Sequence, residues 1–224
     1  MLKDEKSVQA SNIPGEKSEI LNLEPMDPAK IEEVLDRYEQ DHVTHKKGAI
    51  IFTGSGVGKT TYSRNQQPND GGKIDWVDMD PVYKEAGAPP CEEHEPGTPG
   101  SQIKPLPWWT WGDEAINEVE IRSDIVNKAL VERGFWGLTT SFTPDAECQP
   151  TAIVLLPWDE HKRRIVQKWE QNSADGGAKP TEEGFKLVQG HRKWTEEVAK
   201  RNNIPVFEDI DKAVEYVRSL ETNS

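Results

Sequence analysis

The sequence predicts an α/β domain with a mostly parallel sheet of five strands. Short apolar runs of the kind found in buried parallel strands recur from residue 49 onward. Segments with helical periodicity alternate with these runs, as expected when helices connect parallel strands. A glycine-rich stretch directly follows the first apolar run and precedes a helical segment. These observations favour an open α/β sheet that carries a ligand at the end of its first strand.

Length and composition limit the classes of protein to consider. The chain has 224 residues, which fits one medium domain with a tail. Its 40 acidic and 27 basic residues give a net charge of −13, which argues against a general nucleic-acid coat. No apolar run approaches the roughly 20 residues of a membrane helix, and the first residues do not resemble a signal peptide. Two cysteines are too few for a disulfide framework, so we expect a soluble cytoplasmic protein without a membrane partner.

Three regions are predicted along the chain. Residues 1–26 are polar and charged, and we expect a disordered tail. Residues 27–47 are expected to form a flanking helix, with Asp27 as the N-cap and Pro28 in the first turn. Residues 48–220 form the predicted α/β domain. The apolar face of the flanking helix is predicted to consist of Ile31, Val34, Leu35 and Tyr38.

Strands and helices alternate within the predicted domain. The predicted strands are residues 49–52, 73–80, 135–142, 152–156 and 204–207. After the helix that follows the glycine-rich stretch, the predicted helices are residues 113–133, 161–171 and 185–200, and a last helix with Ile210, Ala213, Val214 and Val217 on one face. Gly134 is the expected C-terminal cap of the first of these. Residues 87–107 are rich in proline and glycine and predict an irregular loop, which leads to Trp108, Trp109 and Trp111.

The strongest functional signal is the P-loop pattern Thr-Gly-Ser-Gly-Val-Gly-Lys-Thr-Thr. Its glycines let successive backbone N–H groups point at phosphate oxygens, and the following helix adds its positive dipole end. Lys59 is expected to reach the β- and γ-phosphates of ATP, and the Thr60 hydroxyl to bind Mg²⁺. Thr53 stands where the usual pattern has its first glycine. The predicted nucleotide-binding residues are Gly54, Ser55, Gly56, Val57, Gly58, Lys59, Thr60 and Thr61.

The second predicted strand ends in Asp78-Met79-Asp80. Together with the P-loop, this arrangement resembles the small P-loop kinases of the shikimate, gluconate and polynucleotide kinase kind. The resemblance covers about residues 49–220 and implies a three-layer P-loop kinase fold with a helical lid. By resemblance, Asp78 would help to hold Mg²⁺ and Asp80 would orient or deprotonate an acceptor hydroxyl, although the two roles could be exchanged. The alternative is that both are solvated turn residues.

The lid that the resemblance implies spans about residues 159–193. Arg163 and Arg164 lie in it and would close over the phosphates, where developing charge needs such donors. Arg192 is a further candidate from the other side of the lid. The alternative is a solvated face of a charged helix. The five histidines and two cysteines show no metal-binding or catalytic spacing, and no role is predicted for them.

The resemblance also suggests where the adenine and the acceptor would bind. Asn202 and Asn203, before the last strand, could meet the base, or they could form an ordinary turn. The acceptor would lie between Asp80 and the segment from Pro81 to Arg122. Arg122 could hold an acceptor phosphate or carboxylate, but it is expected to be a surface residue of a helix. The sequence around Asp80 also resembles bacteriophage kinases that phosphorylate hydroxymethyl pyrimidines in DNA.

The expected function is therefore an ATP- and Mg²⁺-dependent kinase. Its acceptor would be a nucleoside, a nucleotide or a modified base in DNA, in the cytoplasm of a bacterium or of a phage-infected host. The alternatives are a kinase of small polyols or metabolites, and a P-loop ATPase that regulates a partner. The aromatic side chains of the acceptor segment suit nucleobases or sugars, but they also suit a core.

Overall fold

The computed structural model describes residues 25–88, 113–172 and 180–222. Five strands form one sheet in the order β2-β3-β1-β4-β5, and every pairing is parallel. The strands are β1 (Ala49–Thr53), β2 (Trp76–Asp78), β3 (Trp136–Thr139), β4 (Ala152–Val154) and β5 (Val206–Phe207). The predicted α/β class with a five-stranded parallel sheet is confirmed.

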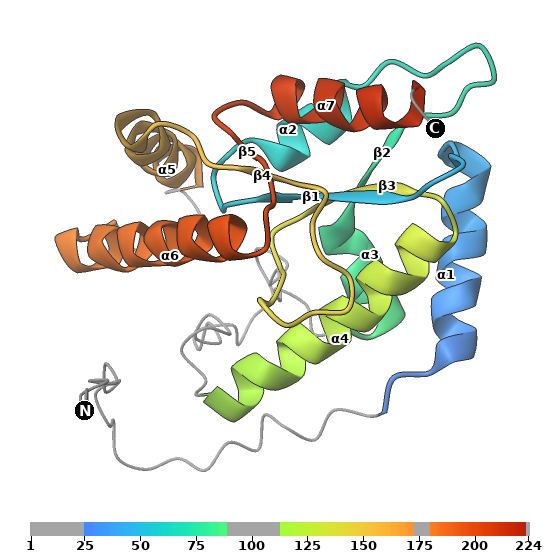
Figure 1. The fold of residues 1–224 in the computed structure, drawn as a ribbon, viewed down its shortest axis with the longest axis horizontal. Helices are drawn as coiled ribbons and strands as arrows, with labels where there is room; N and C mark the ends of the chain where they lie inside the picture. The colour runs from blue at the N-terminus through green and yellow to red at the C-terminus, as the bar shows by residue number, and fades with distance from the viewer. Residues whose placement is uncertain (1–24, 89–112, 173–179, 223–224) are drawn as a thin grey trace.

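Helices cover both faces of the sheet, so the fold has three layers. Figure 1 shows α2 and α7 on one face, and α1, α3 and α4 on the other. Helix α5 lies at the end of the sheet where β1 and β4 end, beside α6. The helices are α1 (Pro28–Asp41), α2 (Lys59–Asn65), α3 (Met79–Ala86), α4 (Asp113–Glu132), α5 (Trp158–Asn172), α6 (Glu182–Arg201) and α7 (Ile210–Thr222).

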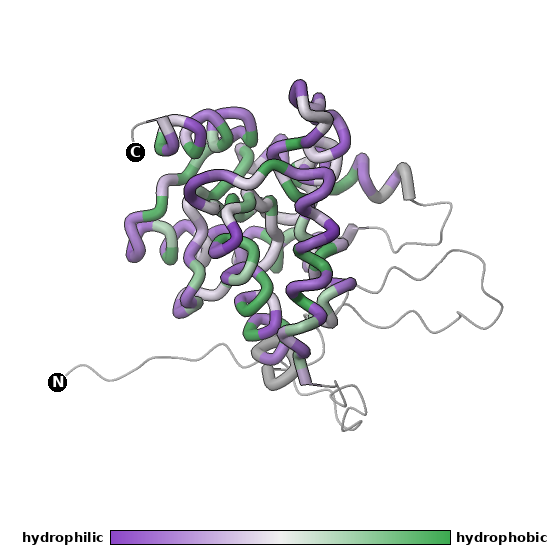
Figure 2. The backbone as a smooth tube through the Cα atoms, turned by 90° about the vertical axis from the view of Figure 1, so that its right-hand side faces the viewer, coloured by the Kyte–Doolittle hydropathy of each residue, from purple (hydrophilic) through white to green (hydrophobic). Residues whose placement is uncertain are grey.

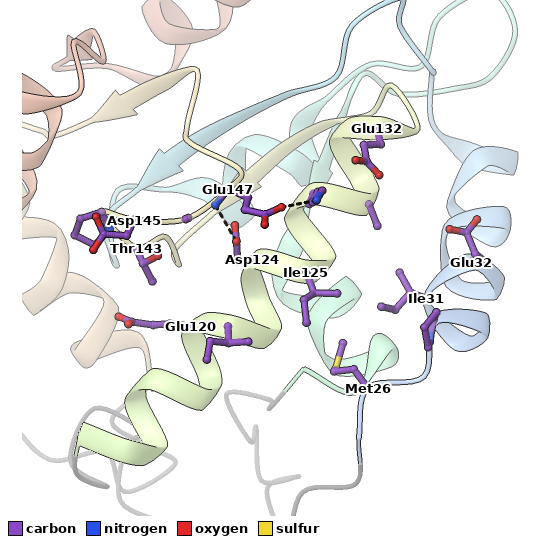
Figure 3. A pocket seen from close by; sticks show the side chains of 16 residues that line it. Met26, Ile31, Glu32, Glu120, Asp124, Ile125, Glu132, Thr143, Asp145 and Glu147 are labelled. Carbon is purple, nitrogen blue, oxygen red and sulfur yellow. Dashed lines mark hydrogen bonds and ion pairs between the residues drawn. The ribbon is translucent and has the colours of Figure 1, made fainter.

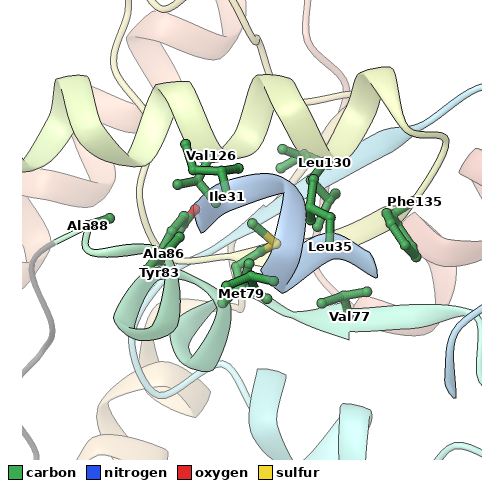
Figure 4. Packing of buried hydrophobic residues seen from close by; sticks show 13 residues of the cluster. Ile31, Leu35, Val77, Met79, Tyr83, Ala86, Ala88, Val126, Leu130 and Phe135 are labelled. Atoms are coloured by element: carbon green, nitrogen blue, oxygen red, sulfur yellow. The ribbon is translucent and has the colours of Figure 1, made fainter. Parts of the chain in front are cut away.

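Each face of the sheet has its own apolar core, because successive strand residues point to opposite sides. On one face, Ile50 and Val77 belong to the cluster that joins α1, α3 and α4. Figure 4 shows side chains of these three helices converging, among them Leu35, which is fully buried. On the other face, Ile51 and Trp76 pack with α7. Truncation of Leu35 to alanine would cost about 2–5 kcal/mol.

Hydrophobic segments concentrate in the interior of the molecule. Figure 2 shows green segments at the centre and mostly purple stretches along the outer helices. Helices α4 and α6 have 20 residues each, but charged residues occur along both. Among the residues that the structure describes, no helix could span a membrane.

Helix α1 begins as the sequence predicts. The Asp27 carboxylate accepts a hydrogen bond from the Ala29 N–H at 2.9 Å, and Pro28 occupies the first turn. The helix ends at Asp41 and not near residue 47, because the chain becomes extended there and pairs with Ile74. The predicted apolar face is confirmed: Ile31, Val34 and Leu35 are buried, and Tyr38 packs against their cluster.

Strand β2 is shorter than the predicted span of residues 73–80. It ends at Asp78, whose carboxylate caps α3 by accepting from the Asp80 N–H at 3.1 Å. Asp80 therefore lies in the first turn of a helix and not at the end of a strand. The Gln66 side chain holds both backbone groups of Trp76, at 2.7 and 2.8 Å, and so joins the end of α2 to this edge strand.

The other differences concern element ends. Strands β3, β4 and β5 are shorter than predicted, while α5 begins at Trp158 and α6 begins after its N-cap Thr181. Gly134 is confirmed as a turn residue after α4, with φ of +89°. The predicted tail up to residue 24, the loop at residues 89–107 and the three tryptophans between 108 and 111 lie outside the described residues.

Candidate functional site

The sheet topology places a switch point at the carboxyl ends of the neighbouring strands β1 and β3. From β1 the chain passes through α2, on one face, to β2. From β3 the chain crosses to β4, which lies on the far side of β1. Phe142, in the connection between β3 and β4, packs on the face of the sheet opposite to α2. Adjacent strands whose connections diverge in this way leave a crevice that binds ligands in α/β proteins. The P-loop lies at this position.

The backbone of the P-loop suits an anion. Gly56 and Gly58 have φ of +82° and +107°, a region that other residues adopt only with strain. The Val57 N–H closes a turn on the Gly54 carbonyl at 3.2 Å. The N–H groups of Ser55, Gly56 and Gly58 donate to no other residue that the structure describes. Together with the first turn of α2, they form a set of donors available to phosphate.

The side chains of the predicted nucleotide-binding residues differ in exposure. Val57 and Lys59 are buried, whereas the side chains of Ser55, Thr60 and Thr61 are exposed. Val57 belongs to the core cluster that packs on α7, so it anchors the loop to the domain. The exposed hydroxyls lie around the start of α2, where a ligand would approach.

Lys59 joins the P-loop to the two predicted carboxylates. Its amine forms a close ion pair with Asp78 Oδ1 and a second pair with Asp80 Oδ2 at 2.7 Å. The side chain of Lys59 is only 5% exposed, that of Asp78 16% and that of Asp80 44%. Asp80 is thus the carboxylate that solvent, or an acceptor, can reach most easily. The structure thus brings Lys59, Asp78 and Asp80 together.

Asp80 accepts one exposed hydrogen bond, and a separate buried network lies deeper between α3, β3 and α4. The Thr140 hydroxyl, just after β3, donates to Asp80 Oδ1 at 3.4 Å. Deeper in, the Tyr83 hydroxyl donates to Asn127 Oδ1 and also bonds Thr139 Oγ1, both at 2.6 Å. Burial raises the pKa of Tyr83 well above its usual value, so the phenol stays protonated. The network fixes α3 against β3 and α4.

The structure separates the two predicted lid arginines. Arg164 Nη1 donates to the Val57 carbonyl at 2.5 Å, so this arginine lies on the P-loop. Arg163 forms a bidentate pair with Glu160 at 2.7 and 2.8 Å and is 63% exposed. Glu160 also accepts from Arg164 Nε, and the two guanidinium groups lower the pKa of Glu160 to about 2. Of the two, only Arg164 contacts the loop within the described residues.

His161 is a site residue for which the sequence predicted no role. Its Nε2 lies 2.7 Å from the Ser55 carbonyl oxygen, and its side chain is buried. Arg192 Nη1, from α6, lies 3.4 Å from the other ring nitrogen. A signal for His161 was present in the sequence, because a residue three positions before Arg164 shares its helix face.

The residues predicted to hold Mg²⁺ offer suitable atoms. Thr60 and Asp78 are oxygen donors, which Mg²⁺ prefers, and Asp80 adds a third. Mg²⁺ is usually held by one or two carboxylates together with substrate phosphates and water. In the described part of the chain, no group of three or more His, Cys, Asp or Glu side chains could hold a metal ion.

Arg122 and Asn202, which were considered for the acceptor and the base, bind other parts of the protein. Arg122 is buried and not at the surface as expected; it donates to Glu118 at 2.6 Å and to the Gly87 carbonyl at 3.1 Å. It therefore links α4 to the end of α3. The Asn202 amide donates to the Pro144 carbonyl and to Gln149, which favours the turn interpretation over contact with a base.

A separate hollow of about 810 Å³ lies between α1, α4 and the loop at residues 143–147. Figure 3 shows Ile125 and Met26 in its wall, together with many carboxylates. Among the described residues that line it, only Lys128 brings positive charge, and Lys128 is paired with Glu147. This surface would repel phosphates, so it is no alternative nucleotide site. Its acidic residues are Glu32, Glu120, Asp124, Glu132, Asp145 and Glu147.

Comparison of the chain with protein-family models, with curated proteins and with solved structures gives no match.

Proposed function

We propose that this protein is an ATP-dependent kinase with a P-loop kinase fold that phosphorylates a hydroxyl group. The observation that carries the proposal is the position of Lys59. Its amine lies at the mouth of a glycine-rich anion loop and between two carboxylates that follow the next strand. A purely structural lysine would not need the free backbone donors beside it. The combination provides a phosphate site and a candidate base within one side-chain length.

Each part of the site has a role in the proposed reaction. The loop N–H groups and Lys59 bind the phosphates, and Arg164 supplies a further positive charge over the loop. Asp80 orients the acceptor hydroxyl and takes its proton. The acceptor oxygen then forms a bond to the γ-phosphorus as the bond to the β-γ bridging oxygen breaks, which leaves ADP. Mg²⁺, held through Thr60 and Asp78, would neutralise charge on the phosphate oxygens when bound.

Nucleotide binding would also rearrange the charges. Lys59 is shared by Asp78 and Asp80 in the structure. When the amine turns to the phosphates, Asp80 loses its ion pair with Lys59, and its carboxylate is left to accept a hydrogen bond from the acceptor hydroxyl. Binding of the phosphates and activation of the base are therefore linked through one side chain.

We propose that the acceptor is a nucleoside, a nucleotide or the hydroxymethyl group of a modified pyrimidine in DNA. The support for this class is the resemblance of the sequence around Asp80, since the described residues include only part of the acceptor region. The net charge of −13 makes free nucleosides and nucleotides easier to accommodate than a duplex. A flipped-out base would be required in DNA.

The test is phosphoryl transfer from labelled Mg·ATP to a panel of nucleosides, nucleotides, small polyols and DNA with hydroxymethyl pyrimidines. We expect labelling of at least one acceptor. Asp80→Asn should abolish transfer yet keep ATP binding. Asp75→Asn is the matched control, because Asp75 precedes β2 at the opposite end and pairs with Arg218. Binding of ATP without any labelled acceptor, with hydrolysis stimulated by a partner, would favour the P-loop ATPase alternative.

A further inference from the structure

Helix α5 holds the outer side of the P-loop through two carbonyl groups. His161 and Arg164 lie one turn apart and contact the carbonyl oxygens of Ser55 and Val57, at 2.7 and 2.5 Å. In a loop that curves around an anion, amide groups point inward and the intervening carbonyls point outward. Contacts that fix the carbonyls therefore also fix the direction of the amides. Ser55 and Val57 flank Gly56, whose N–H belongs to the proposed phosphate donors.

The hydrogen bonds of His161 specify one form of its ring. The Ser55 carbonyl only accepts, so Nε2 must carry the hydrogen. The Arg192 guanidinium only donates, so Nδ1 must be the unprotonated nitrogen. The neutral ring with hydrogen on Nε2 satisfies both partners. Burial lowers the pKa of His161, and the charges of Arg192 and Arg164 lower it further, which favours this neutral form.

We propose that Arg192, His161 and Ser55 form a relay through which α6 and α5 position the P-loop amides for nucleotide phosphates. This inference rests on the proposed function, since it assumes that the loop binds a nucleotide. His161 and Arg192 are positioning residues in this relay. Both ring nitrogens of His161 are already engaged, so the ring has no N–H left for a phosphate. Arg192 acts on the loop through His161.

The relay predicts how ATP and ADP binding respond to changes at His161. His161→Phe keeps a ring but removes the donor to Ser55, and it should weaken binding of both Mg·ATP and Mg·ADP by about tenfold. His161→Gln places an amide N–H near the position of Nε2 and should restore most of the affinity. The control is His191→Phe on α6, because His191 makes ring contacts with Phe52 and Trp194 but lies outside the relay.

Arg192 is tested against its neighbour on α6. Arg192→Met should weaken ATP and ADP binding equally, by several fold, whereas Lys193→Met should not. In the His161→Phe background, Arg192→Met should have no further effect, because residues that act in one chain are not additive. Additive losses would show that Arg192 acts independently of His161, and a larger loss for ATP than for ADP would show that it contacts the γ-phosphate. Either result would overturn the relay.

The measurement is calorimetric titration with Mg·ATP and Mg·ADP, with the thermal midpoint of each variant recorded to confirm folding. Wild-type protein that binds neither nucleotide would overturn the proposed function, and the relay with it. Wild-type protein that binds both, with His161→Phe binding as tightly, would overturn the relay alone. If His161→Phe does not fold, His161→Gln and Arg192→Met are compared with wild type instead. Weaker nucleotide binding in Arg192→Met, together with near wild-type binding in His161→Gln, supports the relay. Unchanged nucleotide binding in Arg192→Met contradicts it.

Discussion

Two regions of the molecule each gather several carboxylates around one cation. At the P-loop, Lys59 lies between Asp78 and Asp80 and is 5% exposed. At the junction of α1 and α4, Arg133 pairs with three acids of α1 and is 26% exposed. The three acids, Glu32, Asp36 and Glu39, are 62%, 64% and 45% exposed.

The difference between these clusters separates a site from a structural contact. Exposed ion pairs are screened by solvent and contribute little, so the Arg133 cluster mainly orients α1 on α4. For a buried lysine, the loss of an ion-pair partner is more destabilising, because it leaves a desolvated charge without compensation. The Lys59 cluster also lies beside backbone N–H groups that have no partner among the described residues. The Arg133 cluster joins α1 to the end of α4. Burial of the cation beside backbone donors that have no partner in the described part of the chain, and not charge alone, distinguishes the candidate site.

The largest expected effect comes from removal of the buried cation. Lys59→Met should weaken Mg·ATP binding by about a hundredfold or more, because the phosphates lose a charge-assisted contact and face two uncompensated carboxylates. Calorimetric titration measures this loss. Arg133→Met is the matched control and should bind as wild type does. Equal losses in both variants would contradict the distinction between the clusters and would indicate a general effect of net charge.

The next effect tests the buried network below Asp80. Tyr83→Phe removes the hydroxyl that bonds Asn127 and Thr139, and leaves a buried amide oxygen without its donor. We expect a loss of about 1–3 kcal/mol in the free energy of unfolding. Urea denaturation measures it, and Tyr216→Phe is a control, since Tyr216 is only partly buried. A Tyr83→Phe protein as stable as wild type would show that the network contributes nothing to the position of α3.

The sequence predicted the parts of the site that depend on local pattern. The P-loop pattern is visible because glycines, lysine and threonine follow an apolar strand in one short stretch. Asp78 and Asp80 come to lie beside it because parallel strands end at the same edge of the sheet. Which arginine contacts the loop could not be predicted. Arg163 and Arg164 are adjacent in sequence, and only the packing of α5 decides which one meets Val57.

The other residues that the sequence did not place correctly also depend on tertiary contacts. His161 acquires its role from Ser55 and Arg192, which are distant in sequence, at separations of 106 and 31 residues. Arg122 is buried because the end of α3 packs over α4, which a single helix pattern does not reveal. Asp80 was assigned to a strand because alternation continues past Asp78, but the capping carboxylate starts a helix there. Local pattern thus predicts the elements, and tertiary contacts decide which side chains meet.

A smaller effect is expected for the exposed cluster itself. Arg133→Gln should lower the free energy of unfolding by about 1 kcal/mol or less. The loss should be largest at low ionic strength and should shrink in 1 M salt, where the Debye length is about 3 Å. Urea denaturation at two salt concentrations tests this. A salt-independent loss would indicate that Arg133 acts through packing of its aliphatic stem and not through charge.

The smallest expected effect is a pH dependence of stability that comes from His161. Because the pKa of His161 is lower in the folded protein than in the unfolded chain, the unfolded chain binds the proton more readily. The stability that the neutral ring contributes is therefore fully present above pH 6.5 and is lost as the pH falls through the folded pKa. His42 and His191 are shifted in the same direction by burial, so the free energy of unfolding should fall from pH 7 toward pH 5. His161→Gln has no titrating group at this position and should give a shallower fall, measured by urea denaturation at each pH. An unchanged slope would mean that burial and the charge of Arg192 do not hold the ring of His161 in its neutral form, which would remove the electrostatic support for the contact between α6 and the P-loop.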